Sequence, residues 1–279
     1  SVIIPTYNRA DWLAEAVSSV LCQTLPPAEV LIVDDGSTDR TRSVVEELAR
    51  ESLLPLKYIH QDNRGAASAR NTGIRAARGD ILCFLDSDDR FVPEKIALQY
   101  AGLQSSGCRI SHTREIWFRR GRPLNQKKIH QPPQGEIFRA SLAMCVVGMS
   151  TVMARRELFA CYGYLDETLP CCEDYDFWLR LGSRERFFLV DLPLTVKNGG
   201  RPDQLSVRYR LGMDKYRIHS LVKLLAGGGL SGEQALLAIR ELERKCAIYG
   251  RGCIKHGREE EGERYLRLPA RFRQPVDDK

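Results

Sequence analysis

Three carboxylates, Asp86, Asp88 and Asp89, follow directly after the apolar segment 79–85. Asp86 and Asp88 are two residues apart, so in an extended chain both side chains would point the same way. Such a pair suits a hard divalent cation, Mg²⁺ or Mn²⁺, whose remaining ligands are commonly substrate phosphates. The alternative is an acidic turn in a solvated loop, which is common for an isolated Asp-x-Asp. The stretch is therefore a candidate metal site, and the polar groups around it decide between a metal site and an acidic turn.

The elements that would position these carboxylates are strands alternating with helices. Apolar runs predict strands over residues 1–5, 29–33, 56–60 and 79–83. Helical spacing predicts helices over residues 11–21, 38–51 and 66–78, with Ser37 or Thr38 capping the second and Gly79 ending the third. This alternation predicts an α/β fold with a mostly parallel central sheet and helices on both faces.

Polar clusters follow three of the predicted strands. They are Tyr7-Asn8-Arg9, Asp34 to Ser37, and Asp86 to Asp89. In parallel α/β sheets, ligands bind at the carboxyl ends of the strands. We therefore expect the three clusters to meet at one rim, which isolated acidic turns would have no reason to do.

The second half of the sequence is less regular. Residues 110–118 alternate as a strand does, and residues 119–128 indicate a hairpin or a basic loop. The small apolar run 145–154 predicts a strand beneath an acceptor site. A short predicted helix begins at Glu173-Asp174-Tyr175-Asp176, and Gly182 could end it. Acidic residues in a first helical turn are stabilised by the helix dipole, so the alternative is that they have no role beyond that.

Five ordered motifs resemble glycosyltransferase family 2 enzymes of the GT-A fold. The motifs span residues 1–9, 33–39, 61–73, 84–89 and 173–178. The resemblance implies an inverting transferase that uses a nucleotide-activated sugar, commonly a UDP-sugar, with Mn²⁺ or Mg²⁺ as cofactor. It also implies a GT-A catalytic domain over residues 1–200, with a nucleotide-sugar-binding half (1–103), a half that binds the acceptor (104–200), and a C-terminal helical extension (201–279).

Residue roles follow from the same resemblance. It implies a catalytic base at Asp174, because the acceptor hydroxyl must lose its proton on the face opposite the leaving group. It places metal ligands at Asp88 and Asp86. Donor-binding residues would be Pro5, Thr6, Tyr7, Arg9, Asp34, Asp35, Arg70, Asp86 and Ser87, and acceptor-binding residues would be Glu173, Gly148, Met149 and Trp178. For Arg70, the alternative is an ordinary surface position on a helix.

The sequence departs from the family pattern in one place. Relatives often carry a histidine near residues 197–206 that can help with the metal or diphosphate, but none occurs between His130 and His219. Asn198 or Arg201 could substitute. The sequence therefore does not identify the third protein ligand of the metal.

Composition and charge restrict the class of protein and its expected location. The chain has 279 residues, 43% of them hydrophobic, and no run approaches the ~20 apolar residues of a membrane span. Nine scattered cysteines favour a reducing, cytoplasmic location, and a first residue other than Met suggests an excised domain.

Residues 1–200 hold 25 Lys+Arg against 25 Asp+Glu, whereas residues 201–279 hold 17 against 11. The basic C-terminal part could contact the inner face of a membrane peripherally, or simply form exposed helices of mixed charge; no nucleic-acid partner is expected.

The glycines from Gly227 to Gly232 have the spacing of a dinucleotide-binding fingerprint, but that fingerprint requires a strand before it. Residues 216–226 have helical spacing instead. We expect Ser231 to Gln234 to form a capping box that starts a helix over 233–249, followed by another over 258–266. This appendage would pack on the catalytic domain or support a homodimer.

Together these features predict a hexosyltransferase-type enzyme of polysaccharide, lipopolysaccharide or other glycoconjugate synthesis, acting on a carbohydrate or lipid-linked acceptor. Two alternatives remain: a sugar-1-phosphate nucleotidyltransferase, and a non-catalytic carbohydrate- or partner-binding module with a decayed site.

Overall fold

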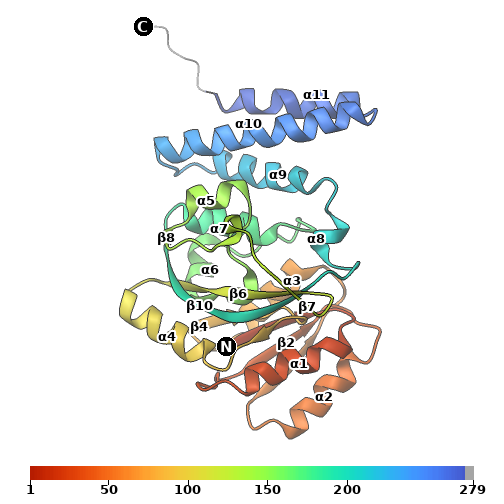
Figure 1. Ribbon diagram of the computed structural model, residues 1–279, viewed down its shortest axis with the longest axis vertical. Coiled ribbons are helices and arrows are strands. Elements are labelled where there is room, and N and C mark those ends of the chain that lie inside the picture. Colours follow the sequence, from red (N-terminus) through yellow and green to blue (C-terminus); the bar gives the residue numbers. More distant parts are fainter. Residues whose placement is uncertain (274–279) are drawn as a thin grey trace.

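The computed structural model describes residues 1–273 and folds them around one ten-stranded sheet (Figure 1). The strands are β1 (Val2–Thr6), β2 (Val30–Asp34), β3 (Leu56–His60), β4 (Ile81–Phe84), β5 (Arg90–Phe91), β6 (Ile110–Arg119), β7 (Arg122–Leu124), β8 (Gly135–Glu136), β9 (Met153–Arg155) and β10 (Arg186–Gly199). The α-helices are α1 (Ala10–Leu21), α2 (Thr41–Glu51), α3 (Ala66–Ala76), α4 (Lys95–Ser106), α5 (Phe138–Ala143), α6 (Glu157–Tyr162), α7 (Glu173–Gly182), α8 (Leu205–Arg208), α9 (Met213–Ala226), α10 (Gly232–Lys255) and α11 (Glu259–Arg267). Short 3-10 helices are η1 (Lys128–His130), η2 (Met149–Thr151) and η3 (Leu268–Arg271).

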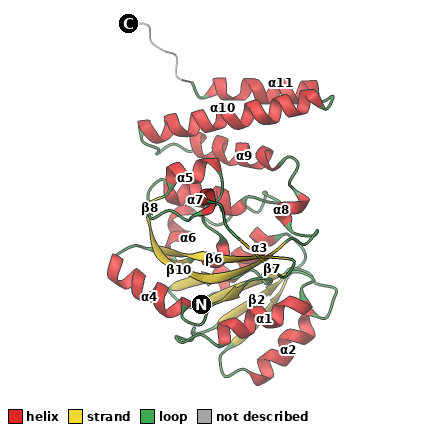
Figure 2. Cartoon of the chain, in the orientation of Figure 1, coloured by secondary structure: helices red, strands yellow, loops and turns green. Residues whose placement is uncertain are grey.

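The first four strands confirm the predicted α/β arrangement. They lie in the order β3-β2-β1-β4, all parallel. Successive residues of a strand face opposite sides of a sheet, so Ile4 packs with α1 and α2 while its neighbour Ile3 packs with α3, α6 and α7. Figure 2 shows these helices on the two sides of the sheet. Because both faces are covered, β1 and β2 are buried along their whole length, whereas the edge strand β3 exposes Lys57 and His60.

The second half of the sheet is mixed rather than parallel. Strand β9 runs antiparallel to both β4 and β6, whereas β6 and β10 are parallel to each other. Residues 119–128 begin a hairpin, as one alternative predicted, because β7 pairs with β6. The predicted strand over 145–154 is wrong for most of its length: Thr151 Oγ1 donates to Gly148 O at 2.7 Å in the turn of η2, and only Met153–Arg155 extend.

Several helix boundaries differ from the sequence prediction; α10, for example, runs to Lys255 instead of ending at residue 249. Helix α2 begins at Thr41, because Ser37 Oγ accepts a bond from Asn8 N and Asp39 Oδ1 accepts the Thr41 N–H. Helix α3 ends at Ala76, before Gly79. A Cβ at Gly79 would lie 2.8 Å from the backbone nitrogen of Ser1, so glycine is required there for the approach of the first strand.

The C-terminal helices pack on α5 and α7, which agrees with one of the two arrangements expected. Leu221 on α9 and Leu242 on α10 share a buried cluster with Phe138, Tyr175 and Leu179. Helix α10 begins with the expected capping box, in which Ser231 Oγ accepts the Gln234 N–H. Within residues 1–273, no helix is long and apolar enough to cross a membrane.

Lys95 is fully buried at the start of α4, and this predicts a distinctive pH dependence of stability. Its Nζ lies 2.5 Å from Gln99 Oε1 and 4.0 Å from the centre of the Phe91 ring. Burial lowers its pKa from 10.5 to about 8. Between these values the unfolded chain binds more protons than the folded one, so the free energy of unfolding rises with pH.

We therefore expect the wild-type protein to gain about 2 kcal/mol relative to Lys95→Met as the pH rises from about 8 to about 10. Denaturant titrations of both proteins across this range measure the difference. Lys57→Met, at an exposed position, is the control and should follow the wild type. Parallel curves for Lys95→Met and the wild type would contradict a neutralised buried lysine.

Candidate functional site

A cavity of about 1100 Å³ opens where the polar clusters following β1, β2 and β4 meet. The residues that the sequence predicted and that line it are Pro5, Thr6, Tyr7, Arg9, Asp35, Arg70, Asp86, Ser87, Asp88, Glu173 and Asp174. The expectation that distant polar clusters meet at one rim is therefore confirmed. Their chemical roles stay predictions.

Arg70 connects the two sides of this group. Its Nη2 donates to Asp86 Oδ1 at 2.7 Å and its Nη1 donates to Glu173 Oε1 at 2.6 Å. Only 6% of Arg70 is exposed, so the surface alternative for this residue is wrong. Although burial disfavours an ionised carboxylate, Arg70 and Lys197 lower the pKa of Asp86. Glu173 differs, because burial and the adjacent Asp174 outweigh Arg70 and raise its pKa.

Asp88 lies against the segment that follows β10. Arg201 forms an ion pair with its carboxylate, and Asn198 Nδ2 donates to its backbone oxygen at 3.0 Å. The two residues suggested in place of the missing histidine therefore both contact Asp88. Two nitrogens of Arg201, Nε and Nη1, are buried without a hydrogen-bond acceptor among residues 1–273. A ligand with anionic oxygens in the cavity would supply acceptors.

The chain turns at Asp86 rather than continuing extended, since Asp89 N donates to Asp86 O at 2.9 Å. Burial, together with Asp88 and Asp86, raises the pKa of Asp89 well above its ordinary value. Ser150 Oγ lies 2.7 Å from its Oδ2. Negative charge is thus crowded at this turn, which is the environment that a hard cation neutralises.

These residues fit a divalent cation that takes only one or two protein ligands. No group of three or more His, Cys, Asp or Glu side chains within residues 1–273 is arranged to hold a metal. Mg²⁺ in particular is commonly bound by one or two carboxylates, with substrate phosphates completing its shell. Asp88 and Asp86 match that pattern, so the donor set suits an ion that arrives with a phosphorylated ligand.

Asp174 lies at the start of α7, beside Glu173. Its Oδ1 accepts the Tyr175 N–H at 2.7 Å, and its Oδ2 accepts the Cys145 thiol at 3.3 Å. Burial and the negative charge of Asp174 raise the pKa of Cys145 well above its ordinary value, so this thiol stays protonated and can donate. The Asp174 carboxylate is therefore oriented by two donors while it lines the cavity.

Of the two carboxylates after β2, only Asp35 lines the cavity. It accepts the Arg64 and Gly65 N–H groups and a bond from Gln61 Nε2. Asp34, also predicted to bind the donor, is 1% exposed and accepts from Ser37 N and Tyr58 Oη. Asp34 belongs to the turn that supports the site, because its side chain lies on the opposite side of the chain from that of Asp35.

Three residues predicted to bind an acceptor do not line the cavity. Trp178 is 1% exposed and Met149 is 3% exposed, and both belong to the core beneath the sheet. Trp178 is on the face of α7 that packs on Phe187. A Cβ at Gly148 would lie 2.4 Å from Glu115 Oε1, so this glycine makes room for a side chain of the protein. None of the three lines the cavity, and their contact with an acceptor stays a prediction.

Sequence reasoning missed Lys197, whose side chain lines the cavity near the end of β10. Glu115, 3.5 Å away, raises its pKa, with further contributions from Asp89 and Asp86, so Lys197 remains a cation. Its position just before Asn198-Gly-Gly at a strand end was a usable signal. The C-terminal extension also supplies cavity residues, among them Arg217 on α9, and no sequence pattern indicated that.

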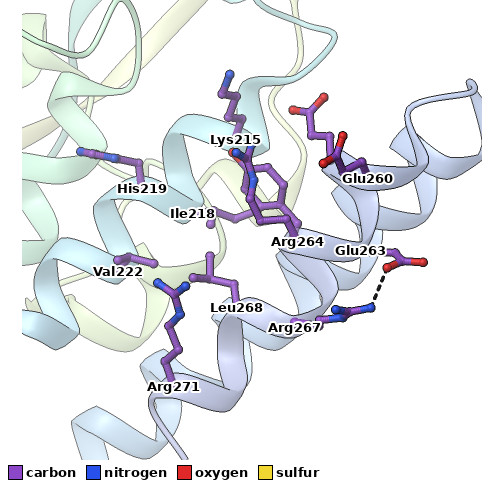
Figure 3. Close-up of a pocket in the computed structure, with 12 residues that line it drawn as sticks. Lys215, Ile218, His219, Val222, Glu260, Glu263, Arg264, Arg267, Leu268 and Arg271 are labelled. Atoms are coloured by element: carbon purple, nitrogen blue, oxygen red, sulfur yellow. Dashed lines mark hydrogen bonds and ion pairs between the residues drawn. The ribbon is translucent and has the colours of Figure 1, made fainter.

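A second cavity, of about 860 Å³, lies between α9 and α11 (Figure 3). Figure 3 shows mixed charges around a small apolar floor formed by Ile218, Val222 and Leu268, with Glu263 paired to Arg267. None of the carboxylates or polar clusters described above reaches it. The larger cavity is therefore the candidate active site.

The Arg70 bridge predicts a large loss of stability on its removal. Arg70→Met would leave Asp86 and Glu173 without their shared partner, which costs about 3–5 kcal/mol when the charges are buried. We expect the melting temperature, measured by calorimetry, to fall by at least about 6 °C. The control is Arg75→Met on the same helix, where the exposed pair with Glu167 should contribute under about 1 kcal/mol. Equal losses in the two variants would contradict the bridge.

The known proteins to which this chain is similar are glycosyltransferases. The family model described as Glycosyl transferase family 2 matches residues 1–163. An uncharacterized glycosyltransferase of Rickettsia conorii is 35% identical over 201 residues, covering 70% of this chain and 32% of that protein. The putative teichuronic acid biosynthesis glycosyltransferase TuaG of Bacillus subtilis is 36% identical over 159 residues, covering 56% of this chain and 62% of TuaG. The chain spans about a third of the length of the Rickettsia relatives.

Two solved structures share the fold. The crystal structure of S. aureus TarS 1-349 in complex with UDP-GlcNAc has a TM-score of 0.76 at 20% identity, covering 97% of this chain and 79% of that one. The mannosyltransferase PcManGT of Pyrobaculum calidifontis, in complex with GDP-Man and Mn²⁺, has a TM-score of 0.64 at 18% identity, covering 97% and 84%. The fold is therefore that of the GT-A enzymes, and with the match over residues 1–163 the chain belongs to glycosyltransferase family 2.

Proposed function

We propose that this chain is an inverting glycosyltransferase that moves a sugar from a UDP-sugar to an acceptor hydroxyl. The observation that carries the proposal is that Asp88 and Asp174, 86 positions apart, line one cavity. Arg70 lies between their neighbours Asp86 and Glu173. A carboxylate for the cation and a carboxylate for the hydroxyl would thus face one cavity, and Arg70 would fix their relative positions.

The nucleoside would bind at the ends of β1 and β2. Pro5, Thr6, Tyr7 and Arg9 line this part of the cavity together with Asp35. The Asp35 carboxylate accepts three bonds within the protein, and a carboxylate offers about four acceptor positions. One position remains for the imide N–H of uracil. The UDP-GlcNAc and GDP-Man complexes of the structural neighbours support a nucleoside-diphosphate sugar as donor.

The diphosphate would lie beside Asp88, where Mn²⁺ or Mg²⁺ would bind with Asp86 nearby. When bound, the ion supplies Lewis-acid stabilisation of the departing diphosphate. The Mn²⁺ complex of the mannosyltransferase supports this cofactor. Arg201 and Lys197 would add positive charge from the protein, and Arg201 would exchange its contact with Asp88 for contacts with phosphate oxygens.

Asp174 would act as general base. The acceptor oxygen attacks the anomeric carbon while its proton passes to the Asp174 carboxylate, and the bond from the anomeric carbon to the phosphate oxygen breaks on the opposite face. The two donors on Asp174, the Cys145 thiol and the Tyr175 N–H, would fix the direction of the free lone pair. Attack from the side opposite the leaving group inverts the anomeric configuration.

The wider setting is proposed from the relatives and the fold. Residues 1–103 would bind the donor and residues 104–200 the acceptor, with residues between 201 and 217 lining one wall of the cavity. The likeness to TuaG supports a role in cell-envelope polysaccharide synthesis, on a carbohydrate or lipid-linked acceptor. The nine cysteines form no disulfide within residues 1–273, which supports a reducing, cytoplasmic location. Membership of a glycosyltransferase family argues against the nucleotidyltransferase alternative.

Replacing the proposed base separates catalysis from binding. Asp174→Asn keeps the size of the side chain and removes its basicity, so we expect transfer or donor hydrolysis to fall by about 10²–10⁴-fold. Binding of UDP with Mn²⁺, measured by calorimetry, should change little. Asp191→Asn, at an exposed carboxylate on β10, is the control. Undiminished metal-dependent turnover of nucleotide sugars by Asp174→Asn would exclude this base, and no turnover by the wild type would favour a non-catalytic binding module.

Donor and metal should stabilise the protein together. We expect UDP plus Mn²⁺ at about 100 times their dissociation constants to raise the melting temperature by about 5 °C, more than the sum of the separate effects. Asp88→Asn should remove the joint effect and leave the weaker effect of UDP alone. Substituting GDP for UDP tests the base preference. Absence of stabilisation by any nucleoside diphosphate with metal would contradict the proposed donor class.

A further inference from the structure

Two exposed segments are attached to the end of β10, one paired with it and the other following it in the chain. One is the hairpin segment, residues 119–130, and the other is the α8 loop, residues 202–212. They are joined through the end of β10, where Gly199 pairs with Arg119 and Arg120 Nε donates to Gly200 O at 3.3 Å. Leu205, in the α8 loop, lines the cavity. The combined surface therefore borders the proposed active site.

This surface carries positive charge, and its one acidic residue, Asp203, is paired with Arg9 and Arg201. No Asp or Glu occurs between Glu115 and Glu136, nor between Asp203 and Asp214. The cations of the two segments are Arg119, Arg120, Arg122, Lys127, Lys128, Arg208 and Arg210, all exposed. They have no salt-bridge partner within residues 1–273. Such a surface attracts anionic partners.

The same segments expose large apolar side chains. Leu211 is 96% exposed, Ile129 is 64% exposed and Val207 is 45% exposed, with Leu124 and Leu205 close to 40%. Single exposed apolar residues are ordinary, but several among unpaired arginines and lysines are typical of segments that lie at a lipid–water interface. Apolar side chains enter the acyl boundary while the cations contact headgroup phosphates.

We propose that the hairpin segment and the α8 loop together dock on an anionic lipid surface. A soluble polyanion or a nucleic acid would use the cations but would leave Leu211 and Ile129 in water, so the apolar residues favour a bilayer. Charge balance alone indicated residues 201–279; the α8 loop lies within that part of the chain, whereas the hairpin segment lies outside it. On the proposed transferase function, docking here would turn the cavity mouth toward a lipid-linked acceptor.

The test is flotation of the full chain with vesicles of phosphatidylcholine, with and without about one third phosphatidylglycerol. Each cation near an anionic surface contributes about fivefold to the partition coefficient, so Arg120→Glu/Lys127→Glu/Lys128→Glu should lower binding by about a hundredfold. Ile129→Ser/Leu211→Ser should lower it by about tenfold on the same vesicles. None of these residues lines the cavity.

Matched controls lie on α10. Arg240→Glu/Arg251→Glu/Lys255→Glu changes the net charge equally at exposed positions, and Leu236→Ser/Ile248→Ser removes comparable exposed apolar side chains. Both control variants should bind anionic vesicles as the wild type does. Metal-dependent hydrolysis of a soluble UDP-sugar should be unchanged in every variant, so loss of vesicle binding is distinguishable from failure of the proposed reaction.

Three results would overturn the inference. The first is no binding of the wild type to anionic vesicles, and the second is equal loss of binding in the α10 controls. The third is undiminished vesicle binding by Ile129→Ser/Leu211→Ser together with full displacement of the wild type by soluble polyphosphate. That outcome would assign the surface to a polyanion instead of a bilayer.

Discussion

The site depends on one guanidinium group. Arg70 is almost fully buried and bonds at once to Asp86, at the end of a strand, and to Glu173, at the start of a helix about a hundred residues away. A carboxylate removed from water is tolerated only when it is paired with a cation, and the same holds for a buried guanidinium. Arg70 and the two carboxylates therefore stabilise one another. Because its planar fork fixes direction as well as distance, this residue sets how far the turn containing Asp88 lies from Asp174. The proposed chemistry requires that separation.

Around this bridge the cavity balances crowded charges of both signs. Asp86, Asp88 and Asp89 lie within one turn, where burial and the two neighbouring carboxylates raise the pKa of Asp89 above its ordinary value. Lys197 and Arg201 supply compensating charge from a separate segment. A nucleoside diphosphate would add negative charge to a region already rich in it. On the proposed function, an accompanying divalent cation would offset that charge.

The C-terminal helices belong to the site's framework. Lys223 on α9 bonds to Asp166 at 2.6 Å and to the buried Asp176 on α7 at 2.7 Å, so it connects the extension to the helix that carries Asp174. Although partial burial opposes ionisation, the bonds from Lys223 and Thr168 lower the pKa of Asp166 to about 2. The extension also provides part of the cavity wall. It therefore positions the helix of the proposed base rather than forming an independent unit.

The sequence by itself determined the alternating strands and helices of the first hundred residues, the capping box at Ser231 and the polar clusters at the strand ends, because all of these depend on local spacing and on neighbours within a few positions. Only the tertiary structure decided which side of the chain each side chain faces and what it meets. Asp34 and Asp35 are adjacent, yet one supports a turn and the other lines the cavity. Trp178 lies one turn after Asp174 on α7, yet it packs into the core. Lys197 becomes part of the site because β10 pairs with β6. These outcomes depend on contacts between segments far apart in the chain, which no local pattern encodes.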